Sequence, residues 1–141
     1  MIDNITTIKL IDKLMSLSVN GKITWATLPY YFESNENEPL RKMVVANNQY
    51  AYSPIEAKNM FLINEYRSYC ANINGGSVII ITTEKQKESK LTLSIQTHAT
   101  HGIFSLYPDN DDIREKLREL ILQITAKTDD IAKYVNELLK L

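Results

Sequence analysis

The chain has 141 residues, of which 44% are hydrophobic and 23% are charged, and its formal net charge is −1. This composition is typical of an ordinary globular domain. It excludes a collagen-like repeat, because there are only 4 Gly and 4 Pro, and a disulfide scaffold, because there is 1 Cys. The near-neutral charge argues against nucleic-acid binding, so we expect no nucleic-acid partner.

The N-terminal residues do not predict a secretory signal. Such a signal needs an unbroken apolar stretch, and Asp3, Lys9 and Asp12 interrupt it here. The aliphatic run at residues 78–81 is far shorter than the ~20 residues that span a bilayer. We therefore expect a cytoplasmic protein without membrane contact, which a single cysteine also fits.

The first part of the chain predicts an amphipathic helix over residues 4–18, because its apolar residues recur at helical spacing. Asp3 or Asn4 can cap this helix at its start. The Asn-Gly pair at residues 20–21 can end it, since Gly tolerates the left-handed conformation. Residues 22–28 then alternate as in a β-strand.

The next stretch predicts a loop followed by two short strands. Residues 33–40 contain three glutamates and no basic residue, which is typical of a solvated loop. A strand is expected over residues 41–46. An Asn-Asn turn at 47–48 then leads into a short return strand in which Tyr50 and Tyr52 face the same way.

Residues 54–64 allow two predictions. Ser53 and Glu56 have the spacing of a capping box, with Pro at the first helical position, and this favours a short helix. The alternative is a strand through Phe61 and Ile63.

The clearest local signal is a β-hairpin over residues 66–73 and 77–83. Asn74-Gly75 supplies the turn, because both residues tolerate positive φ. The second of these strands is apolar on both faces, so we place it at the centre of the sheet. Further strands are predicted over residues 91–96 and 102–107.

The C-terminal part predicts two amphipathic helices, the second opening at Thr128. The apolar residues of the first helix have helical spacing; they are Ile113, Leu117, Leu120, Ile121 and Ile124. The whole pattern predicts an α+β fold in one domain over residues 1–141. It consists of an N-terminal helix, an antiparallel β-meander of five to six strands, and two C-terminal helices packed on the sheet.

The residue types that carry catalysis and metal binding are sparse. His98 and His101 have the spacing H-x-x-H, but zinc needs three or four ligands, so we predict no metal site. Cys70 lies in the middle of a predicted strand, and we expect it to be a buried structural residue. No glycine-rich phosphate loop occurs, and we expect no cofactor.

Tyrosines gather in the middle of the chain, where six of the 8 Tyr lie between residues 30 and 69. Residues 41–67 carry four basic and two acidic side chains, a local charge of +2. Tyr and Arg are favoured at binding surfaces, because a rigid ring stacks and a planar cation pairs with phosphate or carboxylate. We predict a surface that binds a ligand or partner, formed by Arg41, Tyr50, Tyr52, Tyr66, Arg67 and Tyr69. The alternative is that half of the rings pack in the core.

The stretch YRSYCANINGGSVIII at residues 66–81, the strand LTLSIQ at 91–96 and the closing helices resemble small uncharacterised proteins of bacterial prophages and mobile elements. The resemblance covers residues 60–141 and is architectural. It implies an accessory role, such as interference with host defence, and no catalytic residue.

These observations lead to a functional hypothesis, a non-catalytic binding protein. It would bind a partner protein or sequester a small nucleotide-like ligand through the Tyr/Arg-rich region. The apolar face of the C-terminal helices also predicts a homodimer. Two alternatives are a small dimeric chaperone or adaptor, and a hydrolase that uses His98 or His101 with Asp109.

Overall fold

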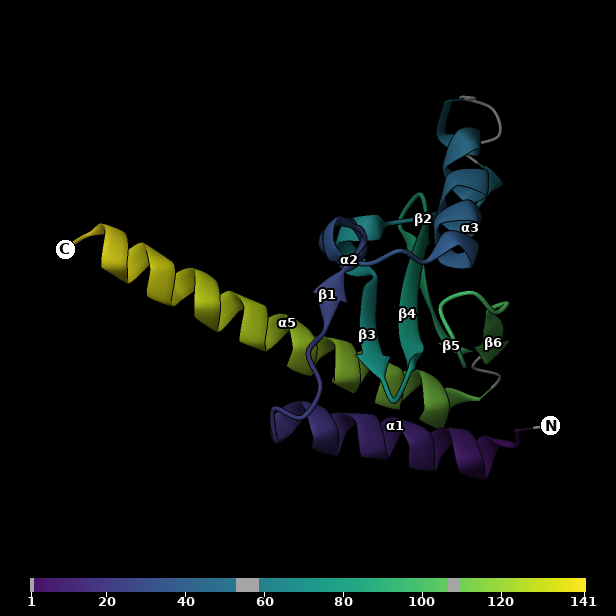
Figure 1. The fold of residues 1–141 in the computed structure, drawn as a ribbon, viewed down its shortest axis with the longest axis horizontal. Coiled ribbons are helices and arrows are strands. Elements are labelled where there is room, and N and C mark those ends of the chain that lie inside the picture. The colour runs from purple at the N-terminus through teal and green to yellow at the C-terminus, as the bar shows by residue number, and fades with distance from the viewer. Residues whose placement is uncertain (1, 53–58, 107–109) are drawn as a thin grey trace. The chain divides into compact units, whose positions relative to one another are not determined.

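The computed structural model describes residues 2–52, 59–106 and 110–141. Their helices and their antiparallel sheet confirm the predicted α+β class (Figure 1). The chain divides into two compact units, one over Met1–Lys22 and Asp109–Leu141 and the other over Ile23–Pro108. One unit is therefore built from both ends of the chain. The single-domain organisation and the packing of the helices on the sheet stay predictions.

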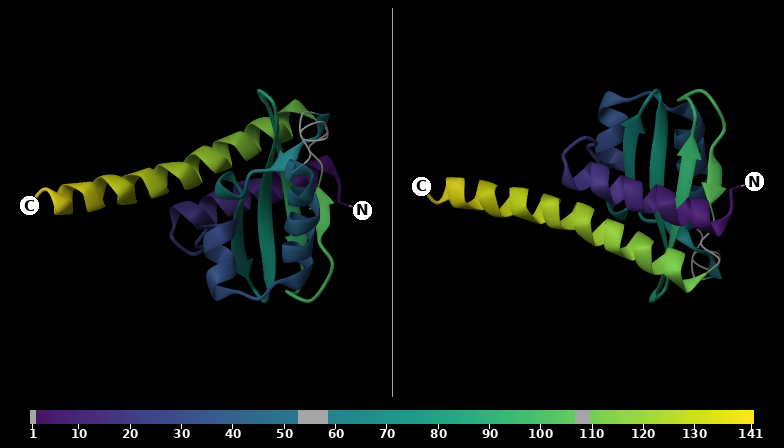
Figure 2. Two further views of the ribbon diagram at one scale, coloured as in Figure 1. Left: turned by 90° about the horizontal axis from the view of Figure 1, so that it is seen from above. Right: turned by 90° about the horizontal axis from the view of Figure 1, so that it is seen from below.

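The first unit contains helices α1 (Asn4–Val19) and α5 (Asp111–Leu139). Asp3 caps α1 as predicted, since its side chain accepts a hydrogen bond from the Thr6 amide at 2.7 Å. The two helices lie side by side and run in the same direction in each view (Figures 1 and 2). Lys116 of α5 donates to Asp12 of α1 at 2.6 Å, which fixes one point of this pairing.

The C-terminal segment forms one helix where the sequence predicts two. Helix α5 continues through Lys127 and Thr128 without a break. The stretch from 110 to 141 contains neither Gly nor Pro, so nothing in it forces the chain out of the helix. A threonine alone does not start a new helix; Thr125, for example, donates its hydroxyl hydrogen bond back to the Ile121 carbonyl at 2.8 Å inside α5.

The second unit is built on an antiparallel sheet of six strands in the described segments, in the order β1-β3-β4-β5-β6 with β2 also paired to β4. The strands are β1 (Ala26–Thr27), β2 (Leu62–Ile63), β3 (Tyr69–Ile73), β4 (Gly76–Lys85), β5 (Glu88–Gln96) and β6 (Phe104–Leu106). The predicted β3–β4 hairpin is confirmed, with Asn74 at φ 50° and Gly75 at φ 83° in its turn. Strand β4 is central, and its residues 77–82 are buried on both faces, as predicted.

Two helices replace the strand predicted over residues 41–46 and most of the loop predicted over residues 33–40, of which only residues 35–37 are not helical. Helix α2 (Leu28–Ser34) follows β1 directly, so the predicted strand over 22–28 shortens to two residues. Helix α3 (Glu38–Asn48) contains the whole predicted strand 41–46, which is therefore wrong. The reason is that the residues just before position 41 favour the start of a helix. Asn37 caps α3 by accepting from the Leu40 amide at 3.2 Å, with Pro in the first turn.

The segment after α3 also differs from the prediction. Tyr50 and Tyr52 lie in a 3-10 turn, η1 (Gln49–Tyr52), and not in a return strand. Strand β2 pairs with β4, so the predicted helix does not extend to residue 64; its residues 53–58 lie outside the described segments. The strand predicted from residue 66 begins at Tyr69 instead, because η2 (Glu65–Arg67) precedes it.

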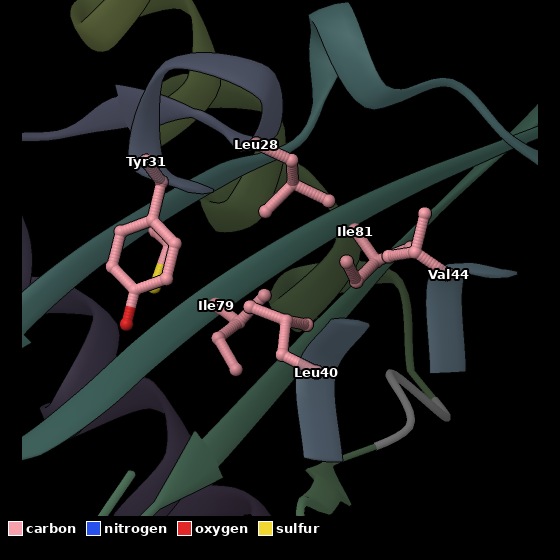
Figure 3. Close-up of a cluster of buried hydrophobic side chains, with 7 residues drawn as sticks. Leu28, Tyr31, Leu40, Val44, Ile79 and Ile81 are labelled. Carbon is pink, nitrogen blue, oxygen red and sulfur yellow. The ribbon is translucent and has the colours of Figure 1, made fainter. Parts of the chain in front are cut away.

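Helices α2 and α3 bury one face of the sheet. Their inward side chains meet β3 and β4 in an apolar cluster of Leu28, Tyr31, Leu40, Val44, Cys70, Ile79 and Ile81 (Figure 3). Leu40 and Val44 lie one turn apart on α3, so both reach the same face of β4. Full burial of such side chains supplies the hydrophobic stabilisation of this unit and holds α2 in place.

Candidate functional site

Two of the predicted site residues, Tyr66 and Arg67, lie exposed in η2, and the Tyr66 side chain is 74% exposed. Helix α2 contacts η2 and carries Tyr30, which is 66% exposed. The Leu28 amide donates to the Ser68 carbonyl at 3.1 Å and joins the start of α2 to the end of η2. We call Tyr30, Tyr66 and Arg67 the α2–η2 surface.

The backbone that carries this surface is held by side-chain hydrogen bonds. Asn64 caps η2 by accepting from the Tyr66 amide at 3.1 Å. The Thr82 hydroxyl of β4 donates to the Arg67 carbonyl at 2.7 Å, and the Thr82 amide donates to Ser68 Oγ at 3.0 Å. The turn is thus anchored to the central strand, which reduces the ordering cost of binding through its side chains.

Tyr69, the third predicted residue of this segment, belongs to the interior. It is 8% exposed and pairs with Thr27 of β1 and Ile80 of β4. The alternation of side chains in a β-strand could not have predicted that Tyr66 is exposed and Tyr69 is buried. Strand β3 begins only at Tyr69, so Tyr66 is not part of it.

Of the remaining predicted residues, Arg41 lies in α3, and Tyr50 and Tyr52 lie in η1, which follows it. Arg41 is exposed in the first turn of α3, with its guanidinium carbon 4.8 Å from the centroid of the Phe32 ring of α2. This cation–π contact links the two helices. Tyr50 is half-buried in η1, nine residues further on, and the Tyr52 side chain lies outside the described part. At ~1.5 Å per residue, α3 separates Arg41 from Tyr50 by more than a hydrogen-bond distance, so the six residues do not form one cluster.

A buried polar cluster that the sequence reasoning missed joins α2, α3 and the sheet. Asn37 Nδ2 donates to Gln96 Oε1 at 2.7 Å and to the Tyr31 hydroxyl at 3.2 Å. The Tyr31 hydroxyl donates in turn to Asn72 Oδ1 at 3.2 Å, and Ser77 Oγ donates to the same oxygen at 2.9 Å. Since these groups satisfy one another, the cluster fixes the position of α2 and α3 against the hairpin.

An open depression of about 180 Å³ lies beside this cluster. It is lined by Tyr31, Asn35, Glu36, Asn72, Gly75, Gly76, Ser77 and Ala99. A Cβ added to Gly76 would lie 2.4 Å from the Gln96 carbonyl oxygen, so only glycine allows the strands to approach here. Of the predicted site residues whose side chains are described, Arg41, Tyr50, Tyr66, Arg67 and Tyr69 do not line it.

The two histidines lie together in the loop between β5 and β6, with ring centroids 5.3 Å apart. Their Nδ1 atoms hydrogen-bond to hydroxyl groups, His98 to Thr100 at 2.8 Å and His101 to Thr97 at 3.0 Å. Asp109, which the hydrolase alternative needs, lies outside the described residues. Within residues 2–52, 59–106 and 110–141, no group of three His, Cys, Asp or Glu side chains could hold a metal ion.

Cys70 is buried, with 1% of its surface exposed. Burial raises the pKa of the thiol to about 11, and hydrogen bonds with Tyr31 and Ser77 oppose this shift only in part. The thiolate is the nucleophilic form, so this environment disfavours nucleophilic chemistry. The predicted structural role of Cys70 agrees with its position in the apolar cluster.

Comparisons with known proteins add no family to these observations. No family model, no curated protein and no solved structure matches the chain. None of the helices in the described segments combines the length and the apolar character that crossing a membrane requires.

Proposed function

We propose that this chain is a non-catalytic, cytoplasmic binding protein that recognises a partner protein through the α2–η2 surface and acts as a homodimer. One observation carries the proposal. Two tyrosines that are 66% and 74% exposed lie on the contacting elements α2 and η2, and η2 also carries Arg67 and is anchored to β4. Tyr and Arg are enriched among residues that dominate binding energies, and an anchored backbone limits the entropy lost on binding.

The exposure of these side chains favours a protein over the nucleotide-like ligand that we also considered. Small-molecule sites are concave and bury most of their ligand. Tyr30, Tyr66 and Arg67 do not line the depression beside the polar cluster, which is lined by other residues. A partner protein can cover such a surface without a pocket, as an adaptor does, and this also fits the accessory role implied by the resemblance to mobile-element proteins.

The proposal of a non-catalytic role is supported by the environment of the one thiol, whose raised pKa disfavours the nucleophilic form. The hydrolase alternative depends on Asp109 meeting His98 or His101. Replacing both histidines by Ala would abolish a hydrolase of that kind and would leave binding at the α2–η2 surface intact.

The experiment compares Tyr66→Ala and Arg67→Ala with wild-type protein. Each immobilised protein captures partners from a cell extract, and every captured protein is then purified and titrated against all variants. The matched controls are Phe104→Ala and Arg118→Ala, whose aromatic and arginine side chains are 54% and 61% exposed elsewhere. We expect the first pair to weaken binding at least tenfold, because hot-spot truncations cost about 2 kcal/mol or more.

Two outcomes would contradict the proposal. Captured partners that bind all four variants equally well would remove the α2–η2 surface from consideration. Saturable binding of a fluorescent ATP analogue that Tyr66→Ala and Arg67→Ala both abolish would assign the surface to a nucleotide-like ligand instead.

A further inference from the structure

Helix α5 carries a hydrophobic repeat along its whole length. Apolar residues alternate at spacings of four and three, which is the pattern of a coiled-coil seam. The seam positions within α5 are Ile113, Leu117, Leu120, Ile124, Lys127, Ile131, Tyr134 and Leu138, and Leu141 continues the spacing two residues after the helix ends. Lys127 alone is not apolar, and it separates the first four positions from the last four.

The two segments of the seam differ in burial. The first four residues are between 0% and 4% exposed, whereas Tyr134 is 62% and Leu138 is 48% exposed. Helix α1 has 16 residues and α5 has 29, so at ~1.5 Å per residue α5 extends about 20 Å further. Figures 1 and 2 show α1 alongside the first part of α5. Beyond it, residues 133–141 are all exposed.

An isolated helical segment of this length is only marginally stable in water, because most helical stability comes from packing of the apolar face. The segment also exposes a group of large apolar side chains, namely Tyr134, Val135, Leu138, Leu139 and Leu141. An exposed apolar stripe with polar residues on its other side marks an interaction site.

We propose that the C-terminal segment from Ile131 to Leu141, which comprises the end of α5 and the two residues after it, packs against the same segment of a second copy of the chain in a short parallel coiled coil. A seam with this spacing is complementary to itself, since each apolar residue fits between residues of an identical helix. It also continues the repeat that is buried in the first half of α5. A two-fold axis along the seam would bury both stripes together.

The flanking charges favour the parallel arrangement. With Leu138 at position a and Tyr134 at position d, Asp130 and Glu137 occupy position g and Val135 occupies position e. In an antiparallel pair the g positions face each other, so acidic residues would oppose acidic residues. In a parallel pair g faces e, and that repulsion is avoided. This inference rests on the homodimer part of the proposed function and gives it a location.

The test measures self-association of the full chain by sedimentation velocity over a range of concentrations. We expect a reversible dimer that Leu138→Glu weakens at least tenfold, because it puts a charge in the seam. The matched control is Leu122→Glu, a change in the same helix at a leucine that is 67% exposed and outside the seam. Far-ultraviolet circular dichroism and thermal unfolding check that each variant folds.

Orientation is tested in a Cys70→Ala background. The Leu141→Cys variant should be cross-linked to its copy by a short bismaleimide reagent, since identical seam positions meet only in a parallel dimer. The Asn136→Cys variant, changed outside the seam, should react far less. Efficient cross-linking at Asn136 with none at Leu141 would overturn the proposed arrangement.

The outcomes separate this inference from the proposed function. A wild-type chain that stays monomeric at the highest concentration measured would overturn both the homodimer and this interface. A dimer that survives Leu138→Glu would overturn the interface alone. Binding at the α2–η2 surface is read from Tyr66→Ala and is independent of both results.

Discussion

The first half of α5 buries its apolar stripe, whereas from residue 133 on the same stripe is exposed to solvent. Leu120 is 0% exposed and Leu138 is 48% exposed, although both occupy the same seam. The neighbouring residues Tyr30 and Tyr31 of α2 differ in the same way, at 66% and 4% exposed. Periodicity therefore determines which side of an element is apolar, and a partner element determines whether that side is buried.

The largest expected effect comes from matched truncations of the two halves of α5. Leu120→Ala should lower the free energy of unfolding by about 3 kcal/mol, since it removes a fully buried side chain and leaves a cavity. Leu138→Ala should cost less than about 1 kcal/mol in a dilute monomer, because its side chain is half exposed. Urea unfolding at low protein concentration measures the free energy of unfolding of both variants. Equal losses in the two variants would contradict the difference between the two ends of α5.

An intermediate effect is expected for the two neighbouring tyrosines. Tyr31→Phe removes a hydroxyl that accepts from Asn37 and donates to Asn72, so it should cost about 1–2 kcal/mol. Tyr30→Phe should leave the free energy of unfolding unchanged, since its ring is 66% exposed. Thermal unfolding of both variants provides the measurement. A larger loss for Tyr30→Phe would show that the Tyr30 hydroxyl has a structural role.

The smallest effect is expected near the boundary between the halves of α5. Among the described residues, Gln123 Oε1 is buried and has no hydrogen-bond partner. Gln123→Met replaces this amide by an apolar side chain of similar length and should raise the free energy of unfolding by about 1 kcal/mol. Urea unfolding checks the sign, and Gln123→Glu serves as the opposite change, since a buried charge should destabilise. A loss of stability in Gln123→Met would show that the amide is satisfied.

The candidate site was predictable in part. Tyr66 and Arg67 are adjacent and exposed in η2, as a binding surface requires. The sequence predicted both as members of such a surface. Tyr30 joins them only because α2 contacts η2, about 35 residues apart in the chain. The cluster of Asn37, Gln96 and Tyr31 likewise depends on contacts between distant residues, which no local spacing reveals.

Sequence alone determined the elements with strong local signals. These are α1 with its Asp3 cap, the Asn74-Gly75 hairpin, the central position of β4 and the apolar stripe of α5. The α+β class follows from them. In each case neighbouring residues carry the physical cause, whether a cap, a positive φ or a regular spacing of apolar side chains.

Tertiary structure decided the rest. Residues 41–46 are helical because the Asn37 cap and the burial of Leu40 and Val44 against β4 outweigh their strand propensity. Contacts between distant segments also decided which tyrosines are exposed and which apolar residues of α5 are buried. Burial depends on which surfaces meet, and a local pattern specifies only one of the two surfaces.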